Sequence, residues 1–158
     1  MTIDCHIKIE GADGESTHSK HSGEIQLLSW GWSVHNAPNV TGGGMAAGKA
    51  TQGELVCQKK YDKSSPNISE HCASGKHLKE VKVSLSLAGG TQEDFLIYTL
   101  KEAFISSHSV TASSGGEVHD SFSVAYTEVE IKYKPQKEDG SLGGENRKAW
   151  NFKTSKKA

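Results

Sequence analysis

The sequence predicts a mainly β fold, a β-barrel of two packed antiparallel sheets with one short α-helix. Three observations support this prediction. Many segments alternate apolar and polar residues with the period of a half-buried strand, and glycine-rich stretches separate them. One segment, residues 65–75, combines the signals that begin and end a helix. The 158 residues fit a single domain over residues 1–158, long enough to bury roughly 68–70% of its unfolded surface.

The first strand is predicted over residues 2–10 because its side chains alternate cleanly. One face carries Ile3, Cys5, Ile7 and Ile9, and the other carries Thr2, Asp4, His6, Lys8 and Glu10. The apolar face is predicted to point to the core and the polar face to solvent. Residues 11–23 are polar and predict a loop.

The second strand is predicted over residues 24–35, where the apolar parity changes between Leu27 and Leu28. A β-bulge at this point accounts for the change. Trp30 and Trp32 then share one parity. We expect both to pack in the core and anchor the barrel, because tryptophans bury a large area.

The glycine-rich residues 42–51, GGGMAAGKAT, place Gly43, Gly48 and Lys49 at the spacing of a phosphate-binding loop. Such a loop needs a hydroxyl residue after the lysine and a helix that begins there. Ala50 has no hydroxyl, and from Glu54 onward the chain alternates as a strand does. The segment therefore predicts a long mobile loop between two strands, and loops of that length are often functional.

The helix is predicted to follow the glycine segment and the strand after it. Ser65 can cap it, Pro66 fits its first turn, and Gly75 can end it. Ile68 and Cys72 lie four residues apart and so share one face of the helix.

Two strands are predicted after the helix. Residues 80–87 alternate strictly, and their inward side chains are Val81, Val83, Leu85 and Leu87. Residues 94–110 contain apolar residues at helical spacing, but their β-branched and aromatic content favours one long strand, or two with a bend.

The C-terminal part predicts two more strands and a tail. The strand over residues 121–135 changes parity near 127–128 and ends at Pro135. A short strand is predicted over residues 148–153, and residues 153–158 are predicted to form a flexible tail.

Composition excludes several classes of function. The formal net charge is −1 and no segment is strongly basic, which argues against nucleic acid as a partner. The sequence has neither a signal peptide nor an apolar run of membrane-spanning length, so no membrane insertion is expected. Its three cysteines are odd in number and lack C-x-x-C spacing, which predicts buried free thiols and a reducing compartment.

No motif indicates catalysis, a cofactor or a metal. Two histidine pairs, His18 with His21 and His71 with His77, have no third ligand at motif spacing. We expect His18 and His21 to be solvated in their polar loop. The sequence contains no G-x-S-x-G segment between a strand and a helix. The carboxylates Asp62, Glu70, Glu93 and Asp94 are predicted to be solvated surface groups.

Five segments stand in order along the chain: IKIEGADGES, EIQLLSWGW, DKSSPNISEHCASGKH, YTLKEAFISSHS and KYKPQK. Together they resemble the hemolysin-coregulated protein (Hcp) family, the tube proteins of the bacterial type VI secretion system. The resemblance covers nearly the whole chain. It implies a phage tail-tube-like β-barrel with one helix, made in the bacterial cytoplasm and assembled as a homo-hexameric ring. It also implies rings stacked into a tube inside a contractile sheath, tipped by a spike protein and expelled with small effector proteins in its lumen.

The resemblance and the strand pattern together indicate two candidate surfaces. Because side chains alternate across a strand, burial of the two tryptophans turns Ser29, Gly31 and Ser33 to the opposite face, which we expect to line the lumen. We expect residues 36–50 to project from one ring face and contact the next ring. The residues of this expected ring-stacking loop are Gly42, Gly43, Gly44, Gly48 and Lys49.

Contacts between subunits of one ring are expected from Tyr98, Phe104 and Tyr126, which lie on long strands. Two other classes of function stay open at this point. One is a secreted β-sandwich binding module, for example for glycans, that forms no tube. The other is a nucleotide-dependent enzyme, whose only support is the imperfect phosphate-loop spacing.

Overall fold

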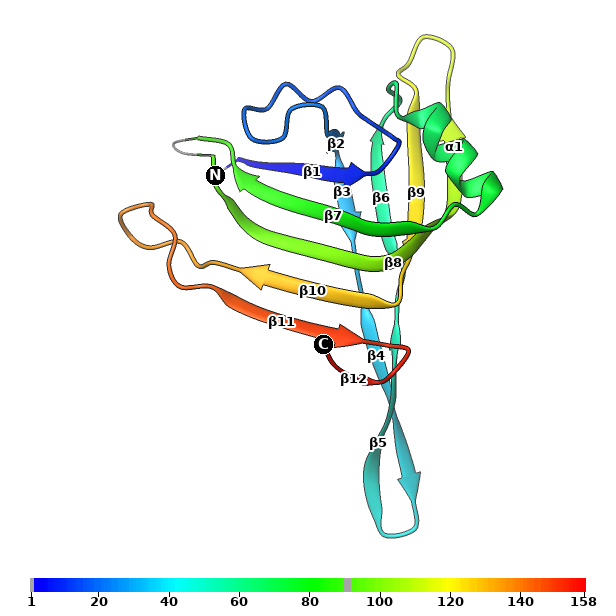
Figure 1. The fold of residues 1–158 in the computed structure, drawn as a ribbon, viewed down its shortest axis with the longest axis vertical. Helices are drawn as coiled ribbons and strands as arrows, with labels where there is room; N and C mark the ends of the chain where they lie inside the picture. The colour runs from blue at the N-terminus through cyan, green and yellow to red at the C-terminus, as the bar shows by residue number, and fades with distance from the viewer. Residues whose placement is uncertain (1, 90–91) are drawn as a thin grey trace.

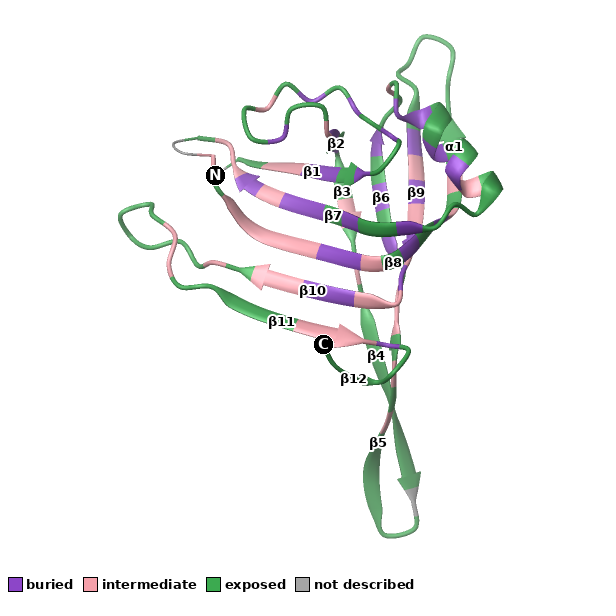
Figure 2. Cartoon of the chain, in the orientation of Figure 1, coloured by how far each residue is buried: buried purple, intermediate pink, exposed green. Residues whose placement is uncertain are grey.

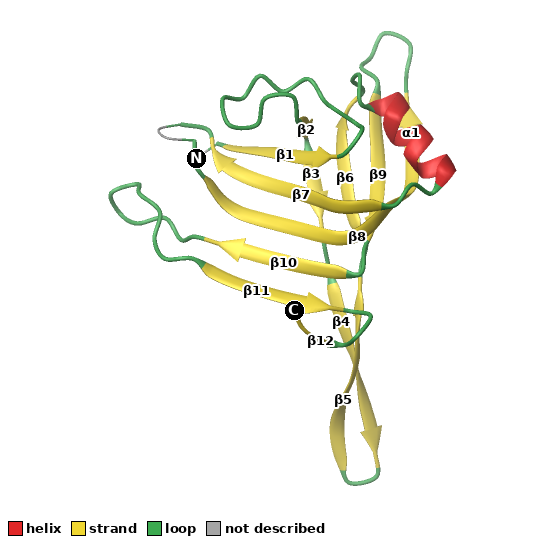
Figure 3. Ribbon diagram, viewed as in Figure 1, coloured by secondary structure: helices red, strands yellow, loops and turns green. Residues whose placement is uncertain are grey.

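A computed structural model describes residues 2–89 and 92–158, and it is mainly β with one short helix, as predicted (Figure 3). The helix is α1, Ser65–Ser74. The strands are β1 Ile3–Ile9, β2 Ile25–Leu27, β3 Ser29–Gly31, β4 Val34–Thr41, β5 Gly44–Gln52, β6 Leu55–Lys60, β7 Leu78–Leu87, β8 Asp94–Thr111, β9 His119–Ala125, β10 Glu128–Tyr133, β11 Asn146–Asn151 and β12 Lys156–Lys157.

The strands form two antiparallel sheets that meet along β8 (Figure 1). The first, which we call sheet A, has the order β12-β11-β10-β8-β7-β1-β2, and the second, sheet B, has the order β3-β6-β9-β8. The 18-residue β8 serves both sheets: its first half pairs with β7 and β10, and its second half pairs with β9. Glu102, at φ 51°, lies between these halves. The predicted long strand with a bend is thus confirmed. Within the described residues, the pairing does not close into a complete barrel.

The predicted parity break at Leu28 is where the chain passes from one sheet to the other. β2 pairs with β1 in sheet A, and β3 pairs with β6 in sheet B. Leu28 between them is exposed, and its backbone N–H donates to the carbonyl of Gln58 at 2.8 Å. The change of parity was expected from a bulge within one strand, but its cause is a change of sheet.

Apolar residues of both sheets form one buried core. Figure 2 colours the buried parts of the strands purple in both sheets. The largest fully buried apolar side chains are Phe122, Ile7, Ile25, Leu55, Ile68, Leu78, Leu100, Ile105, Val81 and Val83. Trp30 and Trp32 pack against this core and approach the ring of Tyr98 edge-on, with centroids 5.0 and 5.4 Å away. Tyr126 is buried and Tyr98 is half-buried, so of the three expected intersubunit residues only Phe104 is exposed in the isolated chain.

The predicted loop at residues 36–50 is instead a β-hairpin that projects away from both sheets (Figure 1). β4 and β5 pair from Val34 with Gln52 to Thr41 with Gly44, and the turn lies at Gly42–Gly43, where Gly43 has φ 123°. Almost all of its described side chains are exposed. The sequence therefore lacks the alternation of apolar and polar residues from which a strand is predicted. We call residues 34–52 the hairpin.

The helix α1 begins and ends close to the predicted residues. Its N-cap is Ser64 and not Ser65, and Gly75 ends it with φ 62°, as predicted. Ser65 is buried at the first helical position, and its hydroxyl accepts hydrogen bonds from the backbone N–H of Asp62 and the ammonium of Lys59. Ser64 and Ser65 therefore both form hydrogen bonds at the N-terminal end of the helix, to Asp62 and, for Ser65, also to Lys59.

Two more predictions about exposure are wrong. His6, expected to face solvent, is 1% exposed because the loop of residues 11–23 places the rings of His18 and His21 against it. His21 in the same loop, expected to be solvated, is 6% exposed.

The C-terminal residues 153–158, predicted as a flexible tail, turn back so that Lys156 and Lys157 pair with the end of β11.

Candidate functional site

The outward face of sheet B carries small hydroxyl side chains on three of its four strands, β3, β8 and β9, and β6 adds Val56 and Gln58. Two rows run across it in register, Gly31–Val56–Ser123–Ser107 and Ser29–Gln58–Ser121–Ser109. Directly paired residues of a sheet point to the same side, so these eight residues form one surface, which we call the serine face.

The three residues predicted to line a lumen lie on or beside this face. Ser29, Gly31 and Ser33 are exposed, whereas Trp30 and Trp32 between them turn to the core, so the predicted alternation is confirmed. A Cβ atom added at Gly31 would have no heavy atom within 4 Å, so the space above it is open.

Hydrogen bonds between its own side chains order the serine face. The Ser29 hydroxyl donates to the Gln58 amide oxygen at 3.3 Å, and the hydroxyls of Ser109 and Ser121 lie 2.8 Å apart. Its rows hold no charged residue. The face therefore offers hydroxyl and amide groups to a binding partner without selecting for the sign of the partner's charge.

Charged groups lie at both ends of the serine face. At one end, the carboxylate of Glu117 lies 3.4 Å from the ammonium of Lys60 and 3.5 Å from Nε2 of His119. At the other end, the Glu54 carboxylate accepts a hydrogen bond from Ser106 at 2.9 Å. These exposed pairs are screened by solvent and each stabilises the fold by at most about 1 kcal/mol.

The glycines and lysine predicted for ring stacking lie apart from the serine face, along the hairpin. Gly42 and Gly43 form the turn, and Gly44, Gly48 and Lys49 lie on β5. A Cβ at Gly48 would come 2.5 Å from the Ala37 carbonyl, at the irregularity between Asn36 and Pro38, so this close approach requires glycine.

The hypothesis of a nucleotide site is wrong. Lys49 and the residues that follow it continue along β5 to Gln52. A phosphate-binding loop needs a helix whose N-terminus begins at this point.

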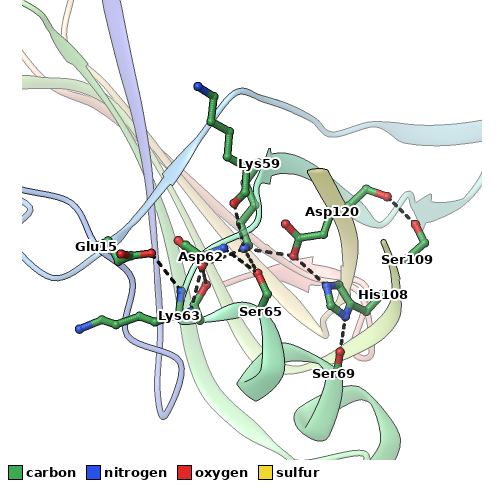
Figure 4. Close-up of polar contacts among 12 residues, drawn as sticks. Glu15, Lys59, Asp62, Lys63, Ser65, Ser69, His108, Ser109 and Asp120 are labelled. Carbon is green, nitrogen blue, oxygen red and sulfur yellow. Dashed lines mark hydrogen bonds and ion pairs between the residues drawn. The ribbon is translucent and has the colours of Figure 1, made fainter. Parts of the chain in front are cut away.

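Sequence reasoning missed a buried ionic network at the N-terminal end of α1 (Figure 4). The Lys59 side chain is fully buried, and its ammonium lies 3.1 Å from Asp120 Oδ2, 2.9 Å from Asp62 Oδ1 and 2.6 Å from Ser65 Oγ. Asp62, predicted to be solvated, is 14% exposed at its side chain. The signal was present, because Lys59 has the inward parity of Leu55 and Cys57.

The network continues to the outer surface of α1. His108 Nε2 lies 2.8 Å from Asp120 Oδ2, and His108 Nδ1 lies 2.6 Å from the Ser69 hydroxyl (Figure 4). A serine, a histidine and an aspartate in contact are the parts of a hydrolase triad. Ser69 lies in the middle of α1, however, where the neighbouring backbone N–H groups serve the helix itself and cannot form an oxyanion hole. Lys59 also shares the Asp120 carboxylate. We assign the network a structural role, which is to tie α1 to the strands behind the serine face.

The remaining titratable clusters also lack the arrangement of a reactive centre. In residues 2–89 and 92–158, no group of three or more His, Cys, Asp or Glu side chains is arranged to hold a metal ion. His71 contacts the Glu10 carbonyl at 2.8 Å, and His77 pairs with Glu102. The thiols of all three cysteines are free, and burial raises the pKa of Cys57. Within the same residues, no helix is long and apolar enough to span a membrane.

Comparisons with known proteins agree on one family. The sequence model of the family described as "Type VI secretion system effector, Hcp" matches residues 6–133. The chain is 39% identical over 163 residues to the protein hcp1 of Pseudomonas aeruginosa, and the match covers 100% of both chains.

Two solved structures have the same fold as this chain. One is described as a type six secretion system protein; it has a TM-score of 0.94 and 28% identity, and the match covers 99% of this chain and 100% of that one. The other is Hcp1 from Salmonella typhimurium, with a TM-score of 0.81, 29% identity and full coverage of both chains.

Proposed function

Because this chain belongs to the Hcp family of type VI secretion proteins, we propose that it is a structural subunit of the inner tube, in which six copies form a ring and the rings stack. In this proposal the chain is one tube domain that performs no catalytic step. It assembles in the bacterial cytoplasm within a contractile sheath and beneath a spike protein. Firing then expels it with small effector proteins in the lumen.

The single observation that supports this function best is the serine face. Other outward faces of the same molecule are charged: the outward row of β1 and β7 includes Lys8, Lys82 and Glu80. A surface that meets only solvent has no need to stay free of charge, whereas a channel wall shared by all subunits must let cargo pass and hold it weakly. We therefore assign Ser29, Gly31 and Ser33 to the wall of the lumen.

The two edges of sheet B support a ring. Among the residues that the structure describes, β3 pairs with β6 alone, so its other edge is open to a partner, and the second half of β8 forms the opposite edge. Two different edges brought together make a head-to-tail contact, which closes into a ring when the rotation per subunit divides a full turn. If the copies of sheet B from neighbouring subunits pack side by side, the serine faces of all subunits line the inner wall of the ring.

The hairpin supports ring stacking. It extends beyond both sheets and exposes Val40 and Met45, each 77% exposed, although it has no core of its own (Figure 2). Apolar side chains on a projecting element are typical of a contact with another protein. In our proposal this contact is the next ring, and Lys49 pairs there with a carboxylate of the neighbouring subunit.

The alternative of a secreted glycan-binding module has no support in the comparisons, because the relative and the solved structures described above are named as Hcp or type VI secretion proteins. The experiment that tests the tube function is the mass of the purified chain by multi-angle light scattering, followed by electron microscopy of the same sample. We expect six chains per particle at micromolar concentration and ring-shaped images. A monomer across the accessible concentration range would contradict the proposal.

A further inference from the structure

Three histidine rings meet where the loop of residues 11–23 covers β1. His6 comes from β1, and His18 and His21 come from the loop. The centroid of the His6 ring lies 4.9 Å from each of the other two, which are 5.2 Å from one another. We propose that this histidine cluster makes the loop an acid-released cover over β1.

The hydrogen bonds of His21 show that it carries a positive charge in the closed loop. Its Nδ1 lies 3.0 Å from a carboxylate oxygen of Glu24, and its Nε2 lies 2.7 Å from a carboxylate oxygen of Asp94. Carboxylates only accept hydrogen bonds, so both ring nitrogens must donate, and the ring is an imidazolium. Burial lowers the pKa of His21, but the bonds to Asp94 and Glu24 outweigh burial and raise it overall.

His6, in contrast, is stabilised in its neutral form in the closed loop. It is 1% exposed, its ring stacks on that of His21 with an interplanar angle of 13°, and none of residues 2–89 and 92–158 forms a hydrogen bond to its Nδ1. The Nε2 of His18 is likewise buried without a bond from the described residues. Burial, followed by the nearby charges of His21 and His18, lowers the pKa of His6. A proton on His6 would place a second cation against the first, away from water.

The charged groups around the cluster do not offset this repulsion. The carboxylates that act on His6 are Glu24 and Asp4, and Glu24 is already engaged by His21, as is Asp94 of β8. The groove beside Glu24 holds three lysines, Lys8, Lys79 and Lys82, and three further carboxylates, Glu10, Asp13 and Glu80, so these charges balance. Asp4 is therefore the carboxylate left to act on a new imidazolium at His6.

Besides the cluster, a small set of polar contacts holds the loop. Ser19 donates to the Gln92 side chain at 2.8 Å, the Lys63 backbone N–H donates to the Glu15 carboxylate at 3.0 Å, and the Ser16 backbone N–H donates to the Glu24 carbonyl at 3.0 Å. At the start of the loop Ala12 is 1% exposed and belongs to the core, so it stays in place. Opening therefore separates residues 13–23 from the sheet and breaks these polar contacts, while the core between the sheets stays packed.

The two histidines affect the closed loop in opposite directions. His21, whose pKa is raised, stabilises the closed loop fully below the ordinary histidine value of about 6.5 and loses that contribution only as pH rises, so the acid response comes from His6. A histidine with a lowered pKa in the closed state binds its proton only after the loop opens, so the closed state loses stability as pH falls below the ordinary histidine value of about 6.5. Opening that takes up one proton becomes about tenfold more favourable for each pH unit below that value.

Amide hydrogen exchange of the intact oligomer tests the proposal, with peptides covering residues 11–23 followed from pH 7.5 to 5. After correction for chemical exchange rates, we expect the loop to lose protection about tenfold per pH unit below about 6.5, while peptides from β6 and β9 stay protected. In His6→Gln, which keeps a polar side chain but cannot be protonated, the acid response should be lost. His77→Gln is the matched control, because His77 is 65% exposed at its side chain and pairs with Glu102 away from the cluster.

His18→Gln provides a second route if His6→Gln folds poorly, because His18 lies in the loop and not in the sheet. It should reduce the acid response in the same direction. An unchanged response in both variants, or protection of the loop that does not vary with pH, would overturn the proposal. A loss of protection in β6 and β9 in parallel with the loop would also overturn it, because acid would then be unfolding the whole chain.

Discussion

The indole N–H of Trp32 donates to the hydroxyl of Tyr126, and this hydroxyl donates to the carbonyl of Gly53 at 2.7 Å. Trp32 precedes the hairpin and Gly53 follows it, so Tyr126 joins both ends of the hairpin to the corner between β9 and β10. Burial raises the pKa of Tyr126 to about 12, so the hydroxyl keeps its proton at neutral pH. These two hydrogen bonds, which we call the Tyr126 relay, fix the base of the hairpin. They also fix the backbone from Gly31 to Ser33, at the edge of the serine face.

Tyr126→Phe should therefore destabilise the fold by about 1–3 kcal/mol, because it leaves a donor and an acceptor without their partner. Denaturant unfolding measures this loss, and hydrogen exchange should show it first at residues 32–36. Tyr133→Phe removes the same hydroxyl from a side chain that is 44% exposed, and it should change stability little. Equal effects of the two substitutions would show that the relay contributes nothing.

The buried pair of Lys59 and Asp120 predicts an asymmetry between two substitutions. Asp120→Ala leaves the Lys59 ammonium with only Asp62 as a charged partner, and breaking a buried pair typically costs about 3–5 kcal/mol. Lys60→Met, the control, removes a lysine from an exposed pair with Glu117 and should cost less than about 1 kcal/mol.

The double substitution of Lys59 to Met and Asp120 to Leu completes this test. It removes both charges and should recover part of the loss, as replacement of a buried ion pair by apolar groups often does. The comparison is made by denaturant unfolding. A double variant less stable than Asp120→Ala would show that the network is more than an ion pair.

Most of the fold could be predicted from the sequence because burial leaves a periodic pattern. The parity of β1, the break at Leu28, the bend of β8 and the end of α1 at Gly75 were all visible in the sequence. The hairpin was not, because strands exposed on both faces have no apolar alternation. Local sequence reports which side of a strand is buried, but it does not report an element that leaves the core.

The candidate site was predictable in part for the same reason. Alternation around Trp30 and Trp32 was enough to turn Ser29, Gly31 and Ser33 outward, but the serines of β8 and β9 joined them only through the register of sheet B. The inward parity of Lys59 was visible in the sequence, but its partner Asp120 comes from a distant strand. His6 has outward parity, and no local pattern could show that the 11–23 loop covers it.

Glu130 predicts an acid dependence of stability. Its side chain is 8% exposed and accepts a hydrogen bond from Arg147 at 2.6 Å, and this bond, more than the nearby charges, lowers its pKa. A lowered carboxyl pKa stabilises the fold above the unfolded-state value of about 4.3, and that stability is lost as pH falls through the folded value. Glu130→Gln should lower the melting temperature at pH 7 and flatten its dependence on pH below about 5.

The control for this prediction is Glu138→Gln, at an exposed carboxylate in the loop between β10 and β11. It should leave both the melting temperature and its pH dependence nearly unchanged. A Glu130→Gln variant that keeps the full acid dependence would assign that dependence to other carboxylates.

The hairpin predicts a separation between ring formation and stacking. Removal of residues 38–47 and closure by an Asn-Gly turn keeps the pairs between Val34–Asn36 and Ala50–Gln52. We expect hexamers by light scattering, but loss of tubes by electron microscopy and of secretion from cells. Normal secretion by the shortened variant, or collapse of the hexamer, would contradict this role.

Gly31→Arg tests the serine face most directly. Nothing lies within 4 Å of the position that its Cβ would occupy, so the substitution should leave the core and the ring intact. It places a long cation on a face whose rows hold no charge, at the point where the absence of a side chain lets a partner come closest. Effector proteins that co-purify with the unsubstituted ring should then be retained several-fold less.

The control is Gly144→Arg, at an exposed glycine with equal space in the loop before β11. It adds the same charge elsewhere and should not affect retention. Size exclusion chromatography shows whether the ring survives in each variant. If Gly31→Arg keeps its cargo, the serine face does not line the lumen, and if its ring falls apart, Gly31 lies in a packed interface between subunits.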